Sequence, residues 1–257
     1  MWKIPTDTSE AIITAQKHVA AQSHVRGIDG AIALRLPETA MLFYMNRGEE
    51  YMLSHFNTRL LTEKFPRFLR ACPIYQVEGY NALCFLDGGR GAPHAVDTLE
   101  TLAALGVKNV VTVGMFGAFA EKIQFGDVLI PGQAFVEEGT SLHYYDSIEY
   151  ACPDSELHAR ALSAIGGKNL PLVSTDAVYR QTFMKEALWR EKGAVGVDME
   201  TSALFSVGKY LGVKVVSILA ASDKHPTQPG EAPWHWKMTP DMRAFLFEKC
   251  SAFALSL

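Results

Sequence analysis

The chain has 257 residues, of which 48% are hydrophobic, and this is the composition of a soluble globular protein with a substantial core. Its formal net charge is −4, and its 24 lysines and arginines are scattered without a run, so nucleic acid is not an expected partner. The four cysteines and eight histidines lack the spacing of metal ligands, so we expect free thiols and no metal site.

The N-terminal sequence and the apolar runs carry no targeting signal. Residues 1–7 lack the apolar core of a signal peptide, and the apolar run at 213–221 is too short to span a bilayer. We therefore expect a cytoplasmic protein without membrane contact, folded as a single domain over residues 1–257.

Apolar runs of strand length alternate with helical patterns from about residue 40 onward, which favours an α/β fold. Strands are expected at 39–45, 82–86, 109–113 and 127–130, and the third is expected to be broken by Gly114 and Gly117. Helices are expected at 49–65, 93–105, 155–165, 183–192, 199–211 and from residue 239 on. The last helix is expected to turn four side chains to the core, namely Met242, Phe245, Leu246 and Phe253.

Two connections are long enough to cover a site. The segment 137–153 is polar and rich in tyrosine, and we expect it to form a flap. The segment 224–237 is rich in proline, glycine and tryptophan, and its position directly after Asp223 favours a lid. Its aromatic run 234–236 either stacks over a flat base or packs in the core.

A glycine-rich turn joins a predicted strand to a predicted helix at Asp87-Gly-Gly-Arg-Gly-Ala-Pro93. In such a turn, backbone N–H groups and the helix N-terminus receive a phosphate or sugar oxygen. The glycines alone are equally typical of an ordinary turn that needs positive φ. Arg90 between them favours an anion site, because its guanidinium points into the same crevice.

Carboxylates follow two strand-like runs. Asp198 and Glu200 end a valine-rich run and open a helical pattern, and Asp223 ends the run that begins at Val215. Either group is by itself compatible with a helix start or a turn. Together they are expected at the carboxyl edge of one sheet, where ligands of open α/β sheets bind. A carboxylate that grips two vicinal hydroxyls, beside a carboxyl kept protonated near a leaving group, indicates cleavage of a glycosidic bond to ribose.

In combination these segments resemble the nucleoside phosphorylase family, which includes bacterial purine nucleoside phosphorylase and uridine phosphorylase. Six segments in the family's order carry the resemblance, at 88–93, 99–108, 113–118, 125–131, 197–200 and 221–223. The resemblance implies a three-layer α/β/α sandwich around a mixed, partly barrel-like sheet, assembled as dimers that often build hexamers. It also implies a pentosyl-transferring enzyme with inorganic phosphate as co-substrate and no cofactor, in which phosphate attacks the ribose C1′ and the base departs.

The resemblance assigns roles to individual residues. Glu200 would hold the ribose 2′- and 3′-hydroxyls, and Met199 would pack against the sugar. Asp223 would protonate or hydrogen-bond N7 of a departing purine, which requires burial to keep its carboxyl uncharged. The substrate-binding set is completed by Asp198, Ser222, Phe116, Gly117, Val178 and Tyr179. The pyrimidine-specific branch lacks this aspartate and has Gln-x-Arg where this chain has Arg-Gln-Thr at 180–182, so a purine is expected.

The chain departs from the family at the phosphate site. The family's Arg-Val-Gly-Ser is here Thr-Val-Gly-Met at 112–115, and the loop Pro-Gly-Asp-Pro-x-Arg is replaced by Tyr-Met-Asn-Arg-Gly at 44–48. Losing a bidentate arginine costs roughly several kcal/mol, or more than about a hundredfold in anion affinity. We predict that Arg90, Arg47 and Gly89 rebuild the phosphate site. The alternatives are a nucleosidase that uses water, and a non-catalytic nucleoside-binding protein.

The histidines are harder to place. In the family a histidine near the N-terminus reaches into a neighbouring subunit's site, and His18 and His24 are both candidates. His94, His143 and His225 lie in predicted loops, where a histidine is more often solvated than catalytic.

Overall fold

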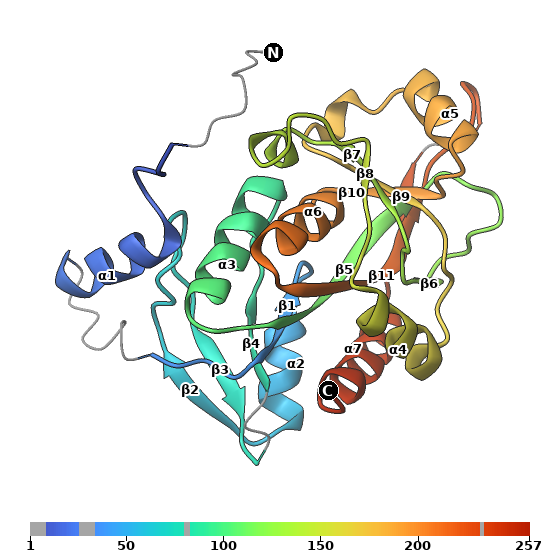
Figure 1. Ribbon diagram of the computed structural model, residues 1–257. Coiled ribbons are helices and arrows are strands. Elements are labelled where there is room, and N and C mark those ends of the chain that lie inside the picture. The colour runs from blue at the N-terminus through green and yellow to red at the C-terminus, as the bar shows by residue number, and fades with distance from the viewer. Residues whose placement is uncertain (1–8, 26–33, 80–82, 232–233) are drawn as a thin grey trace.

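The computed structural model describes residues 9–25, 34–79, 83–231 and 234–257, and in these ranges twelve strands form one mixed sheet (Figure 1). Along its main path the order is β2 (Thr58–Thr62), β3 (Ile74–Val77), β4 (Leu83–Asp87), β1 (Thr39–Phe43), β5 (Asn109–Ala118), β10 (Gly196–Asp198), β9 (Leu172–Thr175), β7 (Ala134–Glu137) and β8 (Tyr150–Ala151). The long strand β11 (Lys214–Lys224) pairs with β5, and also with β6 (Val128–Leu129) and β12 (His235–Trp236).

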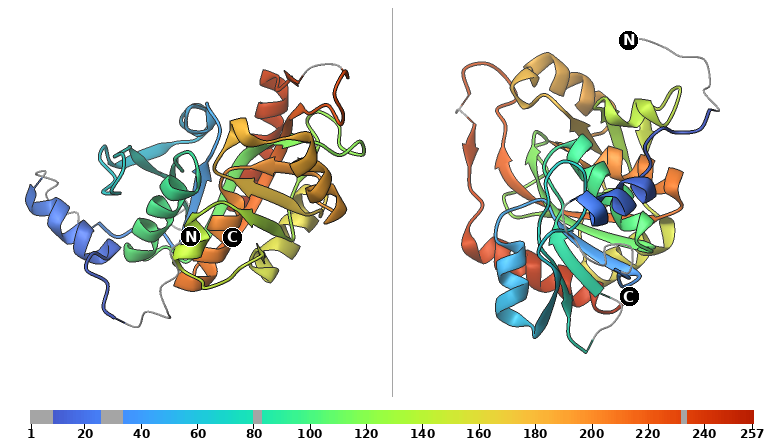
Figure 2. Two further views of the ribbon diagram at one scale, coloured as in Figure 1. Left: turned by 90° about the horizontal axis from the view of Figure 1, so that it is seen from above. Right: turned by 90° about the vertical axis from the view of Figure 1, so that its left-hand side faces the viewer.

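Helices cover both faces of this sheet. On one face lie α1 (Ala15–Val25), α3 (Ala92–Ala104) and α6 (Thr201–Leu211), and on the other lie α2 (Gly48–His55), α4 (Ser155–Ile165) and α7 (Pro240–Ala254). Figure 2 shows α1, α3 and α6 on the side opposite α7. A further helix, α5 (Phe183–Glu191), follows the short 3₁₀ turn Val178–Arg180. The α/β/α arrangement around a mixed sheet, predicted from the family resemblance, is confirmed.

The central strands are apolar throughout because both of their faces are buried. In β1, Ala40 and Leu42 belong to the core beneath α3 and α6, whereas Met41 and Phe43 belong to the core beneath α7. This alternation is the two-residue period of a strand expressed on two apolar faces. It fixes the direction of each side chain and therefore the residues that reach the end of the sheet.

The predicted helix at 49–65 is wrong in its second half. Helix α2 ends at His55, and the next residue, Phe56, is already extended with φ −131° and ψ 149°. Residues Thr58–Thr62 form β2, which pairs antiparallel with β3. The partner strand lies farther along the chain, so the local pattern could not reveal the pairing.

Strand β5 is continuous from Asn109 to Ala118, so the predicted break at Gly114 and Gly117 is also wrong. The glycines serve close packing instead. A Cβ on Gly114 would lie 3.0 Å from Leu219 Cδ2, and a Cβ on Gly117 would lie 2.5 Å from His225 Nε2. Glycine in a strand interior marks such a close approach.

The predicted flap at 137–153 packs against the helices. The Tyr144 hydroxyl donates to Glu100 Oε1 at 2.6 Å, and the Tyr145 hydroxyl donates to the Ser206 carbonyl at 2.8 Å. These bonds hold the segment on α3 and α6, so the flap prediction is wrong.

The core face predicted for α7 is correct in part. Leu246 and Phe253 are buried and Met242 is half-buried, but Phe245 is 51% exposed and the neighbouring Phe247 takes the core position. Thr239 caps the helix by accepting from Met242 N at 3.2 Å, as expected for a threonine before proline. None of the helices in the described ranges is long and apolar enough to cross a membrane.

Candidate active site

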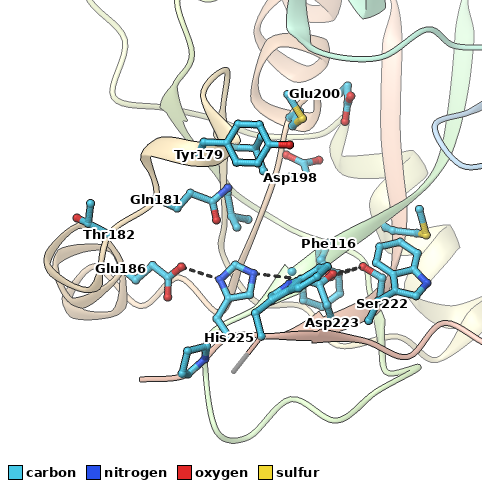
Figure 3. Close-up of a pocket in the computed structure, with 18 of the residues that line it drawn as sticks. Phe116, Tyr179, Gln181, Thr182, Glu186, Asp198, Glu200, Ser222, Asp223 and His225 are labelled. Atoms are coloured by element: carbon cyan, nitrogen blue, oxygen red, sulfur yellow. Dashed lines mark hydrogen bonds and ion pairs between the residues drawn. The ribbon is translucent and has the colours of Figure 1, made fainter. Parts of the chain in front are cut away.

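A cavity of about 880 Å³ opens where β5, β10 and β11 meet. It is lined by ten of the residues that were predicted from the sequence to form the site, namely Asp223, Glu200, Met199, Asp198, Ser222, Phe116, Gly117, Val178, Tyr179 and Arg90. Figure 3 shows Asp198 and Glu200 on one side of this pocket, and a row formed by Glu186, His225, Asp223 and Ser222 on the other. One pocket therefore contains the pair Asp198 and Glu200 as well as Asp223.

The strands meet here because of their register and not because of a shared carboxyl edge. Strand β10 runs antiparallel to β5, and Val197 pairs with Gly117. Strand β11 runs parallel to β5, and Asp223 pairs with the same glycine after an irregularity between Ala221 and Asp223. A bulge of this kind re-aims a side chain. The expectation that both acidic groups follow strands of one direction is wrong, since β10 is reversed.

The carboxyl groups on the first side are buried and hydrogen-bonded. Glu200 Oε1 accepts from Gly91 N at 2.6 Å, at the N-terminus of α3. Asp198 accepts from Ser174 Oγ and from Thr201 Oγ1, each at 2.5 Å. Burial raises the pKa of Glu200, and the charge of Asp198 raises it further. Burial likewise raises the pKa of Asp198 above its ordinary value.

The other side contains a chain of ionisable groups. Glu186 Oε1 lies 2.6 Å from His225 Nδ1, and His225 Nε2 lies 3.1 Å from Asp223 Oδ2. Trp234 Nε1 donates to the same Asp223 oxygen at 2.6 Å, and the Ser222 hydroxyl donates to Asp223 Oδ1. Both ring nitrogens of His225 therefore face a carboxylate.

These contacts determine the protonation states of His225 and Asp223. Burial disfavours the imidazolium of His225, but the hydrogen bonds and charges of Asp223 and Glu186 outweigh it and raise the pKa of His225 to about 9. Burial also acts to raise the pKa of Asp223, but hydrogen bonds from His225, Ser222 and Trp234 hold it below its ordinary value. The prediction that burial leaves Asp223 uncharged is therefore wrong, because the carboxylate has a cationic partner.

His225 was expected to be a solvated loop residue, and the structure instead buries it between two acids. A signal was present in the spacing Asp-x-His, since residues two apart on a strand or its extension point to the same side. Glu186 gave no such signal, because it lies on a separate helix 39 residues away.

Among the described residues that line the cavity there is one arginine, Arg90, and it is already paired. Arg90 Nη1 donates to Asp87 Oδ1 at 2.9 Å and to the Gly89 carbonyl at 2.7 Å. Gly89 supports this turn but does not line the cavity, and its N–H donates to Asp87 Oδ1 at 3.3 Å. Thr112 bonds Ser217 inside the sheet at 2.8 Å.

Arg47 lies elsewhere. It lines a second pocket, of about 520 Å³, beside Tyr51 and Arg243, and its Nε lies 3.9 Å from Glu50 Oε2. The structure does not bring the two predicted phosphate arginines, Arg47 and Arg90, to one cavity.

Tyr44 is a cavity residue that sequence analysis did not select. It is 7% exposed, and within the described part of the chain its hydroxyl has no hydrogen-bond partner. Burial raises its pKa well above the ordinary value, and the charge of Glu200 adds to this, so the hydroxyl keeps its proton. Its ring occupies the space beside Gly88, where a Cβ would lie 2.4 Å away. The feature of the sequence that could have identified Tyr44 is its position in the segment 44–48, which replaces the family's phosphate loop.

Aromatic side chains border the open side. Tyr179 is 96% exposed, and Trp234 and Trp236 line the cavity from the predicted lid. Strand β12 pairs Trp236 with Asp223, which anchors this segment at the pocket. His18 lies on α1, where its ring contacts Phe68 at 5.1 Å between centroids, and the side chain of His24 is outside the described residues.

Comparisons with known proteins identify the family of the chain. The sequence pattern of the phosphorylase superfamily matches residues 60–242, so the chain belongs to this family. The nucleoside phosphorylase family and the enzyme class predicted from the motifs are thereby confirmed.

Three relatives illustrate the similarity. The chain is 28% identical over 176 residues to a DeoD-type purine nucleoside phosphorylase of Clostridium novyi, covering 66% of this chain and 72% of that protein. It is 29% identical over 136 residues to a guanosine phosphorylase of Halorubrum lacusprofundi, covering 51% of this chain and 56% of the relative. It is 30% identical over 142 residues to a DeoD-type purine nucleoside phosphorylase of Bacillus velezensis, covering 52% and 61%. The last two alignments span less than two thirds of those relatives.

Proposed function

We propose that this protein cleaves the N-glycosidic bond of a purine nucleoside, with inorganic phosphate as nucleophile and ribose 1-phosphate as product. The observation that carries the proposal is that Glu200 and Asp223 line one cavity from opposite sides. The names of the relatives, purine nucleoside phosphorylase and guanosine phosphorylase, support a purine as the base.

In this proposal the ribose lies against Glu200 and Met199, and its vicinal hydroxyls donate to the Glu200 carboxylate. Each of these hydrogen bonds contributes about 0.5 to 1.5 kcal/mol, and about 1.5 to 3 kcal/mol when Glu200 is ionised, which is enough to orient the sugar. The Gly91 N–H already holds one oxygen of this carboxylate, so its direction is fixed before the sugar binds.

The base lies on the side of Asp223, His225 and Phe116, with Trp234 and Trp236 at the border of the pocket. Indole and phenyl rings favour a flat, polarisable base by stacking. The Asp223 carboxyl group supplies a hydrogen-bonding partner for the edge of the purine.

The nucleophile lies near Arg90 and Tyr44. Arg90 supplies the positive charge, and the unpartnered Tyr44 hydroxyl is ready to donate to a ligand oxygen. We also propose that the enzyme acts in the cytoplasm as a homo-oligomer, a dimer or a hexamer of dimers, without metal or cofactor. Exposed apolar side chains around α5, among them Met184 and Leu188, support association.

Hydrolysis is a second candidate, favoured by one observation. Asp87 pairs with Arg90 at 2.9 Å, and Arg47 lines a different pocket, so the positive charge available to phosphate is small. Water requires no cationic site.

The test is base release from adenosine, inosine and guanosine with and without phosphate, measured by chromatography with ribose 1-phosphate as second product. Phosphorolysis requires phosphate for turnover. Base release that is indifferent to phosphate identifies a nucleosidase. Nucleoside binding by calorimetry without any turnover identifies a binding protein.

A further inference from the structure

We infer that His225, held by Glu186, supplies through Asp223 the proton that the departing base receives. The inference rests on the proposed function, because it concerns the leaving group of that reaction. It assigns His225 and Glu186 as positioning and proton-supplying residues, and it leaves Asp223 as the group that faces the base.

The geometry begins with the position of the imidazole between two acids. Glu186 comes from α5 and Asp223 from β11, and their carboxylates meet opposite nitrogens of one ring at 2.6 and 3.1 Å. All three side chains are largely buried, with 7%, 9% and 14% of Glu186, Asp223 and His225 exposed. Desolvated contacts of this kind are stronger than the same contacts at a surface.

The groups around His225 favour the charged ring. Asp223 faces it from β11 and Glu186 from α5, while Arg190 of α5 lies 3.9 Å from the other Glu186 oxygen. From strand β5, Gly117 lies beside the ring and has no side chain, and the Ala118 carbonyl accepts from the His225 backbone N–H at 2.8 Å. Trp234 donates to Asp223 Oδ2, the same oxygen that faces His225.

Gly117 provides the space for this arrangement. A Cβ there would lie 2.5 Å from His225 Nε2 and 2.9 Å from Asp223 Oδ2. A side chain larger than hydrogen at this position would force one of the two groups to move. The glycine in strand β5 therefore leaves room for the contact between His225 and Asp223.

The bond between C1′ and N9 breaks, and its electron pair moves into the purine ring. The proton on His225 Nε2 moves to Asp223 Oδ2, and the Asp223 carboxyl gives a proton to N7 of the base. A new bond forms between C1′ and the oxygen of phosphate or water, and the proton lost by that nucleophile returns to His225 through solvent. Glu186 keeps its charge and holds the Nδ1–H throughout.

The experiment compares two leaving groups. A purine needs a proton to depart, whereas 4-nitrophenolate, leaving from 4-nitrophenyl β-ribofuranoside, does not. For His225→Gln we expect kcat for the best purine nucleoside to fall by about a hundredfold or more, with KM changed little. The rate with the nitrophenyl riboside should stay within about threefold of the parent enzyme, because the sugar and nucleophile sites are intact.

Glu186→Gln provides the second variant. Removing this carboxylate lowers the pKa of His225, so the alkaline fall of kcat for the purine nucleoside should move to lower pH. His143→Gln, at an exposed histidine outside the cavity, is the matched control and should change neither substrate. Glu200→Gln should slow both substrates, because both contain the sugar.

The outcomes separate the inference from the proposed function. Equal losses on both substrates in His225→Gln, or an unchanged purine rate in that variant, overturn the inference while the proposed function stands. An unshifted pH profile in Glu186→Gln overturns the role of Glu186. A parent enzyme that releases nitrophenol but no base from any purine nucleoside overturns the proposed function itself.

Discussion

Val197 and Asp223 lie on opposite sides of one residue of the central strand, since both pair in register with Gly117 of β5. Asp198 and Glu200 follow Val197 in the chain, and His225 follows Asp223. One glycine thus aligns the two halves of the cavity. The strand beside it cannot shift by one residue without turning every following side chain to the other face.

A methyl group at this glycine tests the alignment. Gly117→Ala should destabilise the fold by about 1 to 3 kcal/mol, because the new Cβ overlaps His225 and Asp223 and forces them apart. Urea unfolding measures this change. Gly139→Ala is the matched control, since Gly139 has a φ of −90° and a Cβ there would meet Asp176 Oδ2 at an ordinary contact distance of 3.6 Å. A Gly117→Ala protein as stable as its parent contradicts the close approach.

Glu200→Gln tests the sugar grip. It replaces a buried carboxyl group, which the proposal places against two hydroxyls, by an amide with a single acceptor oxygen, so kcat/KM should fall by about ten- to a hundredfold. Steady-state kinetics with the best purine nucleoside measures it. A variant with unchanged kcat/KM contradicts the assignment of Glu200 to the sugar.

The same residue predicts a pH dependence of stability. Because burial raises the pKa of Glu200, the folded protein keeps a proton that the unfolded chain releases. The free energy of unfolding should therefore decrease as pH rises from the ordinary glutamate pKa to the raised one, and level off above it. Urea unfolding between pH 4.5 and 9 should show a smaller decrease for Glu200→Gln than for the parent. Identical pH profiles contradict the raised pKa.

Tyr44→Phe separates binding from stability. The phenol oxygen is buried without a partner in the described residues, so its removal should leave stability unchanged or raise it by about 1 kcal/mol. If the hydroxyl donates to phosphate, the KM for phosphate should rise by about tenfold while the KM for nucleoside stays the same. A loss of stability contradicts the unpartnered hydroxyl, and an unchanged KM for phosphate contradicts its role at the nucleophile.

The two arginines make a matched pair for the nucleophile site. Arg90→Ala should raise the KM for phosphate by about a hundredfold in a phosphorylase, because Arg90 is the arginine among the described cavity residues. Arg47→Ala should leave that KM unchanged, since Arg47 lines the other pocket. Phosphate-dependent kinetics on both variants measures the difference. A larger effect at Arg47 than at Arg90 contradicts this placement.

Local sequence predicted the elements that contain their own signals. Helix α4 was expected at 155–165 and is observed at Ser155–Ile165, where Asp154 caps it by accepting from Leu157 N at 3.0 Å. The second half of the predicted helix at 49–65 failed, because β2 is a strand only through its pairing with β3. Interactions within one turn of a helix join residues that are close in the sequence, whereas strand pairing depends on residues that are far apart in it.

The sequence by itself determined which chemical groups are present and in which family motifs they stand, because Glu200, Asp223 and the glycine turn at 88–91 lie in short segments with recognisable spacing. Only the tertiary structure decided the direction of β10, the separation of Arg47 from Arg90 and the charge of Asp223. That charge depends on His225 and on Glu186 behind it, which approach Asp223 only in the folded chain. Electrostatic and packing energies depend on distances in space, and residues far apart in sequence acquire those distances only when the sheet and α5 assemble.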